Sequence, residues 1–225
     1  MKTLVKKIFA SVNIYLIFPS ERSLQGLRPF VIEFFQRQSK GVLHIGGSTG
    51  QEAEDYFRQG LPVIWVEADP LTFATLEKRI KKFPNQRALN YLVSDAEREM
   101  EFFVTDNSGL SSSVYPLSAY GQDFWNIKNV ESKKLFSRTI DSLLEVDLSA
   151  YDFWVIDVQG HELEVLKGAE NALKTCNWIL CEISTIPYYE NQHLYHEICD
   201  WLLERDFCPL YKPSANHCEV LYARR

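Results

Sequence analysis

Acidic, histidine and glycine residues follow several short apolar runs, at positions suited to ligand binding and proton transfer. One run ends in His44 to Gly50, a second ends at Glu67, and a third is followed by Asp157 to Glu162. Ser94-Asp95 and Glu182 occupy equivalent positions after two further runs. In an open parallel sheet, ligands bind outside the carboxyl ends of the strands. The spacing therefore predicts that these residues share one site.

The glycine-rich turn from Gly46 to Gly50 has few side chains, so a ligand can approach its backbone closely. Glu67 lies near the spacing at which an acidic side chain accepts hydrogen bonds from ribose hydroxyls. A dinucleotide fingerprint requires glycine where this chain has Ser48 and Gln51. The helix that follows opens with carboxylates, within residues 51–55, that would repel a pyrophosphate. These features favour a cationic ligand without phosphate over a dinucleotide.

The elements that position these residues alternate between short strands and amphipathic helices. Apolar runs predict strands at 42–45, 63–66, 89–93, 153–156 and 178–183, with an extra strand at 101–105. Helical spacing predicts helices over 27–35, over 163–173 after Gly160, and over 194–202. Thr49-Gly50-Gln51-Glu52 matches a capping box, and Asp69-Pro70 supplies a helix N-cap with proline at the first helical position. The pattern indicates a parallel sheet covered on both faces.

Residues 96–140 interrupt this alternation. The segment contains the turn-rich 106–109, a serine run at 111–113 and the aromatic residues Tyr115, Tyr120, Phe124 and Trp125. Long excursions between sheet elements are often binding loops. We therefore expect this segment to border a ligand.

The chain is divided into an N-terminal helical extension, residues 1–40, and one main domain, residues 41–225. Lys2, Lys6 and Lys7 precede an apolar stretch from Ile8 to Phe18, which is too short to span a bilayer and lacks a signal-peptide cleavage pattern. We expect a helix packed on the domain, and membrane association is disfavoured.

The composition of the chain bears on its substrate class and its cellular location. The net charge is −6, from 24 basic and 30 acidic residues, which disfavours nucleic acid as a substrate. The five cysteines all lie in the C-terminal quarter and do not form a disulfide pattern. A reducing cytoplasm is the expected location.

The stretch from Ile156 to Glu170, with the sequence IDVQGHELEVLKGAE, resembles the signature segment of FkbM-type methyltransferases. Further resemblance covers the segments 44–47, 50–52, 66–70, 92–95, 111–113 and 139–141, together with Glu182. The resemblance implies an α/β fold, with a Rossmann-like, doubly wound, seven-stranded methyltransferase sheet. It also implies S-adenosylmethionine as the cofactor and an oxygen acceptor on a sugar, glycan or small natural product.

The resemblance and the strand-end positions together predict the binding residues. Those expected to bind the cofactor are His44, Gly46, Gly47, Ser48, Gly50, Glu67, Ala68, Ser94, Asp95 and Asp157. In two places the chain departs from the family pattern, since His44 replaces a common aspartate and Gly47-Ser48 replaces a common Ala-Asn. Both departures bear on how the amino-acid end of the cofactor is held.

Asp157, His161 and Glu162 are the expected catalytic residues. One hypothesis is that Asp157 positions the acceptor hydroxyl and neutral His161 takes its proton, because a helix N-terminus disfavours imidazolium. A second gives the proton to Asp157 and leaves His161 to shape the pocket. In a third, a divalent magnesium or manganese ion is held by Asp157, Glu182 and His161, although no metal ligand is assigned.

Two other classes of function remain open at this stage. A nicotinamide-dependent oxidoreductase shares the general fold, and a catalytically silent cofactor-binding protein can retain the same scaffold. Binding of NADH would identify the first, and absence of turnover with every acceptor would identify the second.

Overall fold

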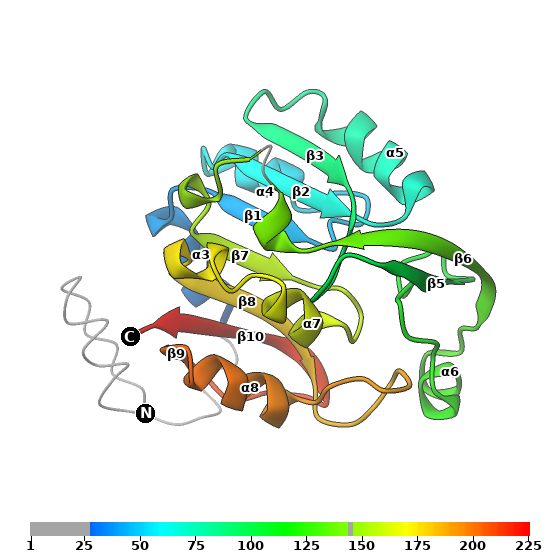
Figure 1. Cartoon of the computed structure of the whole chain (residues 1–225). Helices are drawn as coiled ribbons and strands as arrows, with labels where there is room; N and C mark the ends of the chain where they lie inside the picture. Colours follow the sequence, from blue (N-terminus) through cyan, green and yellow to red (C-terminus); the bar gives the residue numbers. More distant parts are fainter. Residues whose placement is uncertain (1–27, 144–145) are drawn as a thin grey trace.

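The computed structural model describes residues 28–143 and 146–225, and its centre is a seven-stranded sheet (Figure 1). The strand order is β3-β2-β1-β7-β8-β10-β9. The strands are β1 (Val42–Ile45), β2 (Val63–Glu67), β3 (Gln86–Asn90), β7 (Phe153–Ile156), β8 (Trp178–Ser184), β9 (Phe207–Pro209) and β10 (His217–Arg224). From β3 to β8 the neighbouring strands are parallel, whereas β10 runs antiparallel to both β8 and β9. Every residue of β1, β2 and β7 is buried, as expected for strands covered on both faces.

The sheet is flanked by α3 (Arg28–Gln38), α4 (Ala53–Arg58), α5 (Pro70–Ile80), α7 (Glu162–Lys167) and α8 (Tyr195–Leu203). Short 3-10 helices lie at Ile140–Ser142, Leu148–Ala150 and Ala172–Thr175. Phe35 of α3 packs against Trp178 of β8, with 5.9 Å between ring centroids, so α3 lies on the sheet. The division of the chain at residue 40 stays a prediction.

The excursion between β3 and β7 forms a second sheet with the order β4-β6-β5. It is built from β4 (Leu92–Val93), β5 (Glu99–Thr105) and β6 (Asn129–Arg138), with α6 (Ala119–Trp125) inserted between β5 and β6. Figure 1 shows β5 and β6 as a ribbon projecting from the main sheet, with α6 below it. The predicted loop is therefore an ordered sheet and helix beside the carboxyl ends of the strands.

Several local predictions are confirmed and others are wrong. Asp69 is the N-cap of α5 and accepts a hydrogen bond from the Thr72 amide, as expected. The capping box at 49–52 is wrong, because α4 begins after Glu52 and that residue makes no side-chain cap. The run 89–93 is divided between β3 and β4, and the helix expected over 163–173 divides into α7 and a 3-10 turn. β6, β9 and β10 are strands that the hydrophobic pattern did not indicate.

The apolar N-terminal stretch from Ile8 to Phe18 lies outside the described residues. Within the described ranges, no helix combines the length and hydrophobicity required to span a membrane.

Candidate active site

Two cavities border the central strands, and Asp157 lines both. The first lies between the turn after β1, the end of β2 and the excursion, and we call it the cofactor cavity because the sequence predicted cofactor-binding residues there. Its lining includes Gly46, Ser48, Glu67, Ala68, Leu110, Ser112, Asp157, Gln159 and His161. The second, here called the α3–α4 cavity, has a volume of about 690 Å³ and is lined by His44, Glu52, Tyr56, Leu180 and Glu219 among others.

In the turn after β1, the backbone of Gly46 lies very close to the backbone of Asp157. Gly46 has a φ of +84°, and a Cβ placed on it would lie 1.6 Å from the carbonyl oxygen of Asp157. Only glycine fits there. The Ser48 hydroxyl is buried and finds no hydrogen-bond partner among the described residues, although Ser48 lines the cofactor cavity. A turn with few side chains and an unpartnered hydroxyl suits a ligand bound against this backbone.

Glu67 ends β2 and holds the turn in place. Its Oε2 accepts a hydrogen bond from the Ser48 amide at 2.8 Å, and its Oε1 accepts one from the Asp69 amide at 2.8 Å. Burial raises the pKa of this carboxyl to about 7. Each carboxylate oxygen has a second lone pair, so Glu67 can also accept hydrogen bonds from two ribose hydroxyls.

His44 lies apart from this cavity and lines the α3–α4 cavity. Its ring stacks on Trp65 at 4.6 Å, and its Nδ1 lies 3.2 Å from the Tyr56 hydroxyl. Burial lowers the pKa of His44 to about 3, so the ring is neutral at physiological pH. Gly47 and Gly50 lie against Trp65 and Leu76, where they allow close packing of the turn.

Ala68 lines the cofactor cavity, whereas Ser94 and Asp95 do not. The Ser94 hydroxyl is 3.0 Å from Nε2 of His161 and donates to Asp95 at 2.9 Å. Asp95 also pairs with Arg98 at 2.7 Å. The contact expected between Asp95 and an adenine amino group stays a prediction.

His161 is 2% exposed and belongs to the same network as Ser94. Its ring packs edge-on against Tyr115 at 5.2 Å, and its Nδ1 lies 3.6 Å from a carboxylate oxygen of Glu164. The pKa of His161 is lowered to about 3, and burial is the main cause. The ring is thus neutral, as expected, but desolvation accounts for this.

Glu162 is 1% exposed and braces the turn after β7. Its Oε1 accepts hydrogen bonds from the amides of Val158 at 3.2 Å and Gly160 at 2.9 Å. Burial raises the pKa of Glu162 to about 8. The contacts are those of a residue that fixes the shape of the turn.

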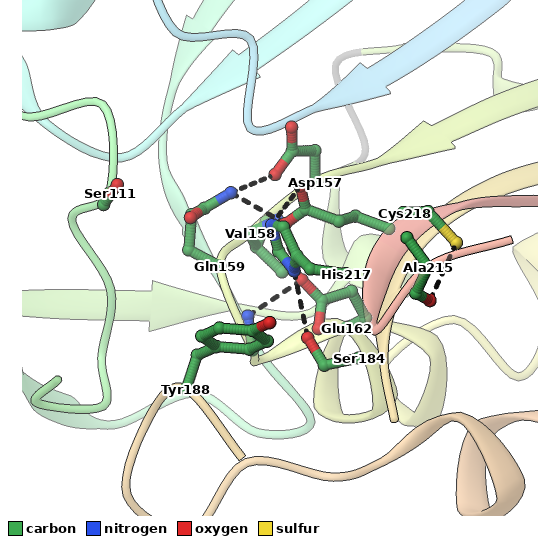
Figure 2. Close-up of polar contacts among 12 residues, drawn as sticks. Ser111, Asp157, Val158, Gln159, Glu162, Ser184, Tyr188, Ala215, His217 and Cys218 are labelled. Carbon is green, nitrogen blue, oxygen red and sulfur yellow. Dashed lines mark hydrogen bonds and ion pairs between the residues drawn. The ribbon is translucent and has the colours of Figure 1, made fainter. Parts of the chain in front are cut away.

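Asp157 forms a cluster with Gln159, Glu182 and His217. Glu182 was expected at this site from its strand-end position, whereas no role was predicted for Gln159 or His217. Gln159 Nε2 donates to Asp157 Oδ1 at 2.6 Å and to Glu182 Oε2 at 2.7 Å, and His217 Nε2 lies 3.0 Å from Glu182 Oε1. Figure 2 shows the Gln159 amide nitrogen joined to the Asp157 carboxylate, with His217 on the neighbouring strand. Gln159 was visible inside the signature segment, whereas His217 lies on the unpredicted strand β10.

Aromatic rings of the excursion and the loop after β8 form a wall beside this cluster. Trp125 stacks on Tyr188 at 4.5 Å, and its ring lies 5.2 Å from that of His217. Tyr120 and Phe124 are stacked on each other and exposed. We call Tyr120, Phe124, Trp125, Tyr188 and Tyr189 the aromatic wall.

No group of three or more His, Cys, Asp or Glu side chains in residues 28–143 and 146–225 is arranged to hold a metal ion. His161 belongs to the Ser94 network, away from the hydrogen bonds of Asp157 and Glu182. The side-chain arrangement therefore does not support the three-residue metal site considered from the sequence.

Comparison with curated proteins identifies two similar methyltransferases. The chain is 23% identical over 185 residues to the 2-O-methyltransferase NoeI of Sinorhizobium fredii, covering 76% of this chain and 74% of that protein. It is 32% identical over 108 residues to the hexuronic acid methyltransferase AglP of Haloferax volcanii, covering 44% of each.

Solved structures share the fold at low sequence identity. The PH0226 protein of Pyrococcus horikoshii superposes with a TM-score of 0.51 at 11% identity, covering 93% of each chain. A SAM-dependent methyltransferase of Aquifex aeolicus superposes with a TM-score of 0.50 at 13% identity, covering 87% of each chain.

The family that matches the sequence is the methyltransferase FkbM domain, over residues 44–208. That range includes the glycine turn, Glu67, the excursion and the Asp157 turn. It also covers most of the seven-stranded sheet. The chain therefore belongs to the FkbM methyltransferase family and is an enzyme that uses S-adenosylmethionine as its methyl donor.

Proposed function

We propose that the protein is an O-methyltransferase that acts on a hydroxyl of a sugar, a glycan or a related small natural product. The observation that carries this proposal is the position of Asp157, which lines both the cofactor cavity and the α3–α4 cavity. A carboxylate there can hold an acceptor hydroxyl beside the bound donor and accept its proton.

The residues present fit the cofactor. Gly46, Ser48, Glu67 and Ala68 would hold its adenosine part, and Asp157 and His44 lie toward the α3–α4 cavity, where its amino-acid end would extend. When bound, S-adenosylmethionine supplies an electrophilic methyl group on a sulfonium. The chain's own contribution is largely alignment, which is worth about 7 to 11 kcal/mol in well-oriented intramolecular reactions.

The acceptor side favours a polyhydroxylated molecule. The aromatic wall offers ring faces for stacking, and the Asp157 cluster offers carboxylate oxygens that accept hydrogen bonds from hydroxyls. One of the two curated relatives is a 2-O-methyltransferase, and the other is a hexuronic acid methyltransferase. These observations support a carbohydrate hydroxyl as the acceptor.

Asp157 is the proposed base, with His161 shaping the cavity. His161 Nε2 is engaged by Ser94, and the pKa of about 3 makes its ring a weak proton acceptor at neutral pH. The alternative, in which His161 takes the proton, requires its ring to leave Ser94. A placed base typically contributes about 100-fold to 10,000-fold to the rate. The two assignments therefore predict a large loss of rate in different variants.

The test is methyl transfer from isotopically labelled S-adenosylmethionine to a panel of free sugars, uronic acids and glycosides, each paired with its deoxy analogue. We expect labelled methyl ether on at least one hydroxylated member and none on the matched deoxy compound. Transfer only to amine acceptors would contradict the proposal. Binding of the donor without transfer to any panel member, including a natural glycan extract, would favour a catalytically silent protein.

A further inference from the structure

Gln159 lies in the turn after β7 with a left-handed backbone, at a φ of +58°. A residue other than glycine rarely adopts this conformation, and such strain persists only where the surroundings hold it. Gln159 is followed by Gly160, whose φ is +97°. The strained turn therefore fixes the direction of the Gln159 side chain, and the hydrogen bonds of that side chain offset the backbone strain.

The Gln159 amide uses its full set of donors on the two carboxylates. Its Nε2 donates to Asp157 Oδ1 at 2.6 Å and to Glu182 Oε2 at 2.7 Å. The amide orientation follows from this environment, because the reverse orientation would direct the amide oxygen at two carboxyl groups. A neutral side chain thus bridges two acids without adding a charge.

The amide oxygen is fixed as well. The Tyr189 hydroxyl is 2.7 Å from Gln159 Oε1, and it is also 3.1 Å from the carbonyl oxygen of Ser111. Tyr189 is 1% exposed. Residues 109–112 supply part of the cofactor cavity wall. Tyr189 therefore ties Gln159 to the segment that borders the cofactor.

Glu182 is held from its other side by β10. His217 Nε2 lies 3.0 Å from Glu182 Oε1, and His217 Nδ1 lies 3.0 Å from the Ser184 hydroxyl. Gln192 Nε2 donates to the same hydroxyl at 3.0 Å. Because Ser184 accepts from Gln192, its own proton is free to go to His217 Nδ1, which leaves a proton on Nε2 for Glu182.

We propose that Gln159 and Tyr189 are positioning residues, which hold the Asp157 carboxylate in line with the acceptor hydroxyl by tying it to Glu182 and to the 109–112 wall. The inference rests on the proposed function in one respect, the assignment of Asp157 to that hydroxyl. The acceptor proton passes to Asp157 as the oxygen–methyl bond forms and the sulfur–methyl bond breaks. Gln159 and Tyr189 exchange no proton in this step.

Replacement of Gln159 by glutamate tests the bridge, because it keeps the shape and adds a carboxylate. The ionisable groups around this position are Asp157 on β7, Glu162 on α7, Glu182 on β8, His217 and Glu219 on β10, Tyr189 after β8 and Glu52 before α4. A further like charge beside Glu182 raises its pKa, so the apparent titration of the cluster moves to higher pH.

The first measurement is the affinity for S-adenosylhomocysteine against pH, by calorimetry, which requires no acceptor. In a Glu67→Ala background, which removes the titration of Glu67, we expect the midpoint of the pH dependence with Gln159→Glu to lie about one pH unit or more above that with Gln159. An unchanged midpoint in a folded variant overturns the bridge. This readout stands even if the acceptor proves not to be a hydroxyl, so it separates the positioning claim from the proposed function.

Tyr189→Phe tests the anchor, since it removes one hydroxyl and leaves the ring. We expect the single-turnover rate of methyl transfer to fall about 10-fold while S-adenosylhomocysteine affinity stays within about twofold. Tyr222→Phe is the matched control, because Tyr222 is also buried and its hydroxyl has no partner among the described residues. Equal rates in Tyr189→Phe, Tyr222→Phe and the wild type would overturn the role of Tyr189.

Discussion

The proposed cofactor side and the proposed acceptor side of this site are assembled in different ways. The cofactor side uses two strand ends close in sequence, joined by the hydrogen bond from the Ser48 amide to Glu67. The acceptor side gathers Trp125, Gln159, Tyr188 and His217 from separate elements. Backbone geometry thus dominates the first and side-chain networks the second. Mutations should therefore act as structural failures on one side and as graded losses on the other.

The largest effect is expected for Gly46→Ala. The added Cβ would lie 1.6 Å from the Asp157 carbonyl oxygen, and the φ of +84° is unfavourable for alanine. We expect loss of S-adenosylhomocysteine binding and a lowered melting temperature, measured by calorimetry and thermal denaturation. Gly60→Ala is the control, because its φ is +75° but nothing lies within 4 Å of the added Cβ. If both variants bound the ligand equally, the close approach would not matter.

Asp157→Asn addresses the point where the two sides meet. We expect single-turnover methyl transfer to fall about 100-fold to 10,000-fold, the usual contribution of a placed base, with S-adenosylhomocysteine affinity changed much less. His161→Ala serves as the comparison and should lose less than about 10-fold. The base assignment would pass to His161 if its variant lost more than Asp157→Asn together with the near-neutral limb of the pH profile.

Glu67→Ala tests the contribution of Glu67 to cofactor binding. Loss of hydrogen bonds to a charged acceptor costs about 1.5 to 3 kcal/mol, or roughly 10-fold to 150-fold in affinity for S-adenosylhomocysteine. Since the pKa of Glu67 is about 7, its carboxyl becomes protonated as the pH falls below 7 and loses acceptor strength. Wild-type affinity should decline over that range, and Glu67→Ala should lose the part of the decline that Glu67 contributes. Parallel pH profiles from calorimetry would contradict the assignment.

Trp125→Ala should give the smallest effect. Aromatic stacking contributes about 0.5 to 1.5 kcal/mol, so the KM for a sugar acceptor should rise about 2-fold to 13-fold while cofactor affinity is unchanged. Phe136→Ala removes another exposed aromatic residue, on β6, away from the wall, and should leave KM unaltered. A change in cofactor affinity instead of KM would show that the aromatic wall binds the cofactor and not the acceptor.

Much of the fold was predictable because hydrophobic periodicity specifies buried strands directly. The ends of β1, β2 and β7 follow from their apolar runs, and with them the positions of the Gly46 turn, Glu67 and Asp157. β6 escaped prediction because only one of its ten residues is buried. The Asp157 pairing with Glu182 through Gln159 could not be derived from spacing, because it depends on a left-handed backbone angle in a single residue.

The expectation for Ser94 and Asp95 illustrates a further limit. Strand-end position predicted both residues at the site, but side-chain direction decides which residue faces the cavity, and neither lines it. Ser94 turns to His161 and Asp95 turns to Arg98. Periodicity gives the strand end and leaves these rotamers undetermined.

The antiparallel strand β10 has a consequence for biosynthesis. It enters between β8 and β9, both of which are translated earlier, and it carries His217 to Glu182. Until β10 emerges from the ribosome, β8 has an unpaired edge of the kind that invites association between nascent chains. Glu182 also lacks its histidine at that stage. Completion of the sheet and completion of the carboxylate cluster are therefore one event in the maturation of this enzyme.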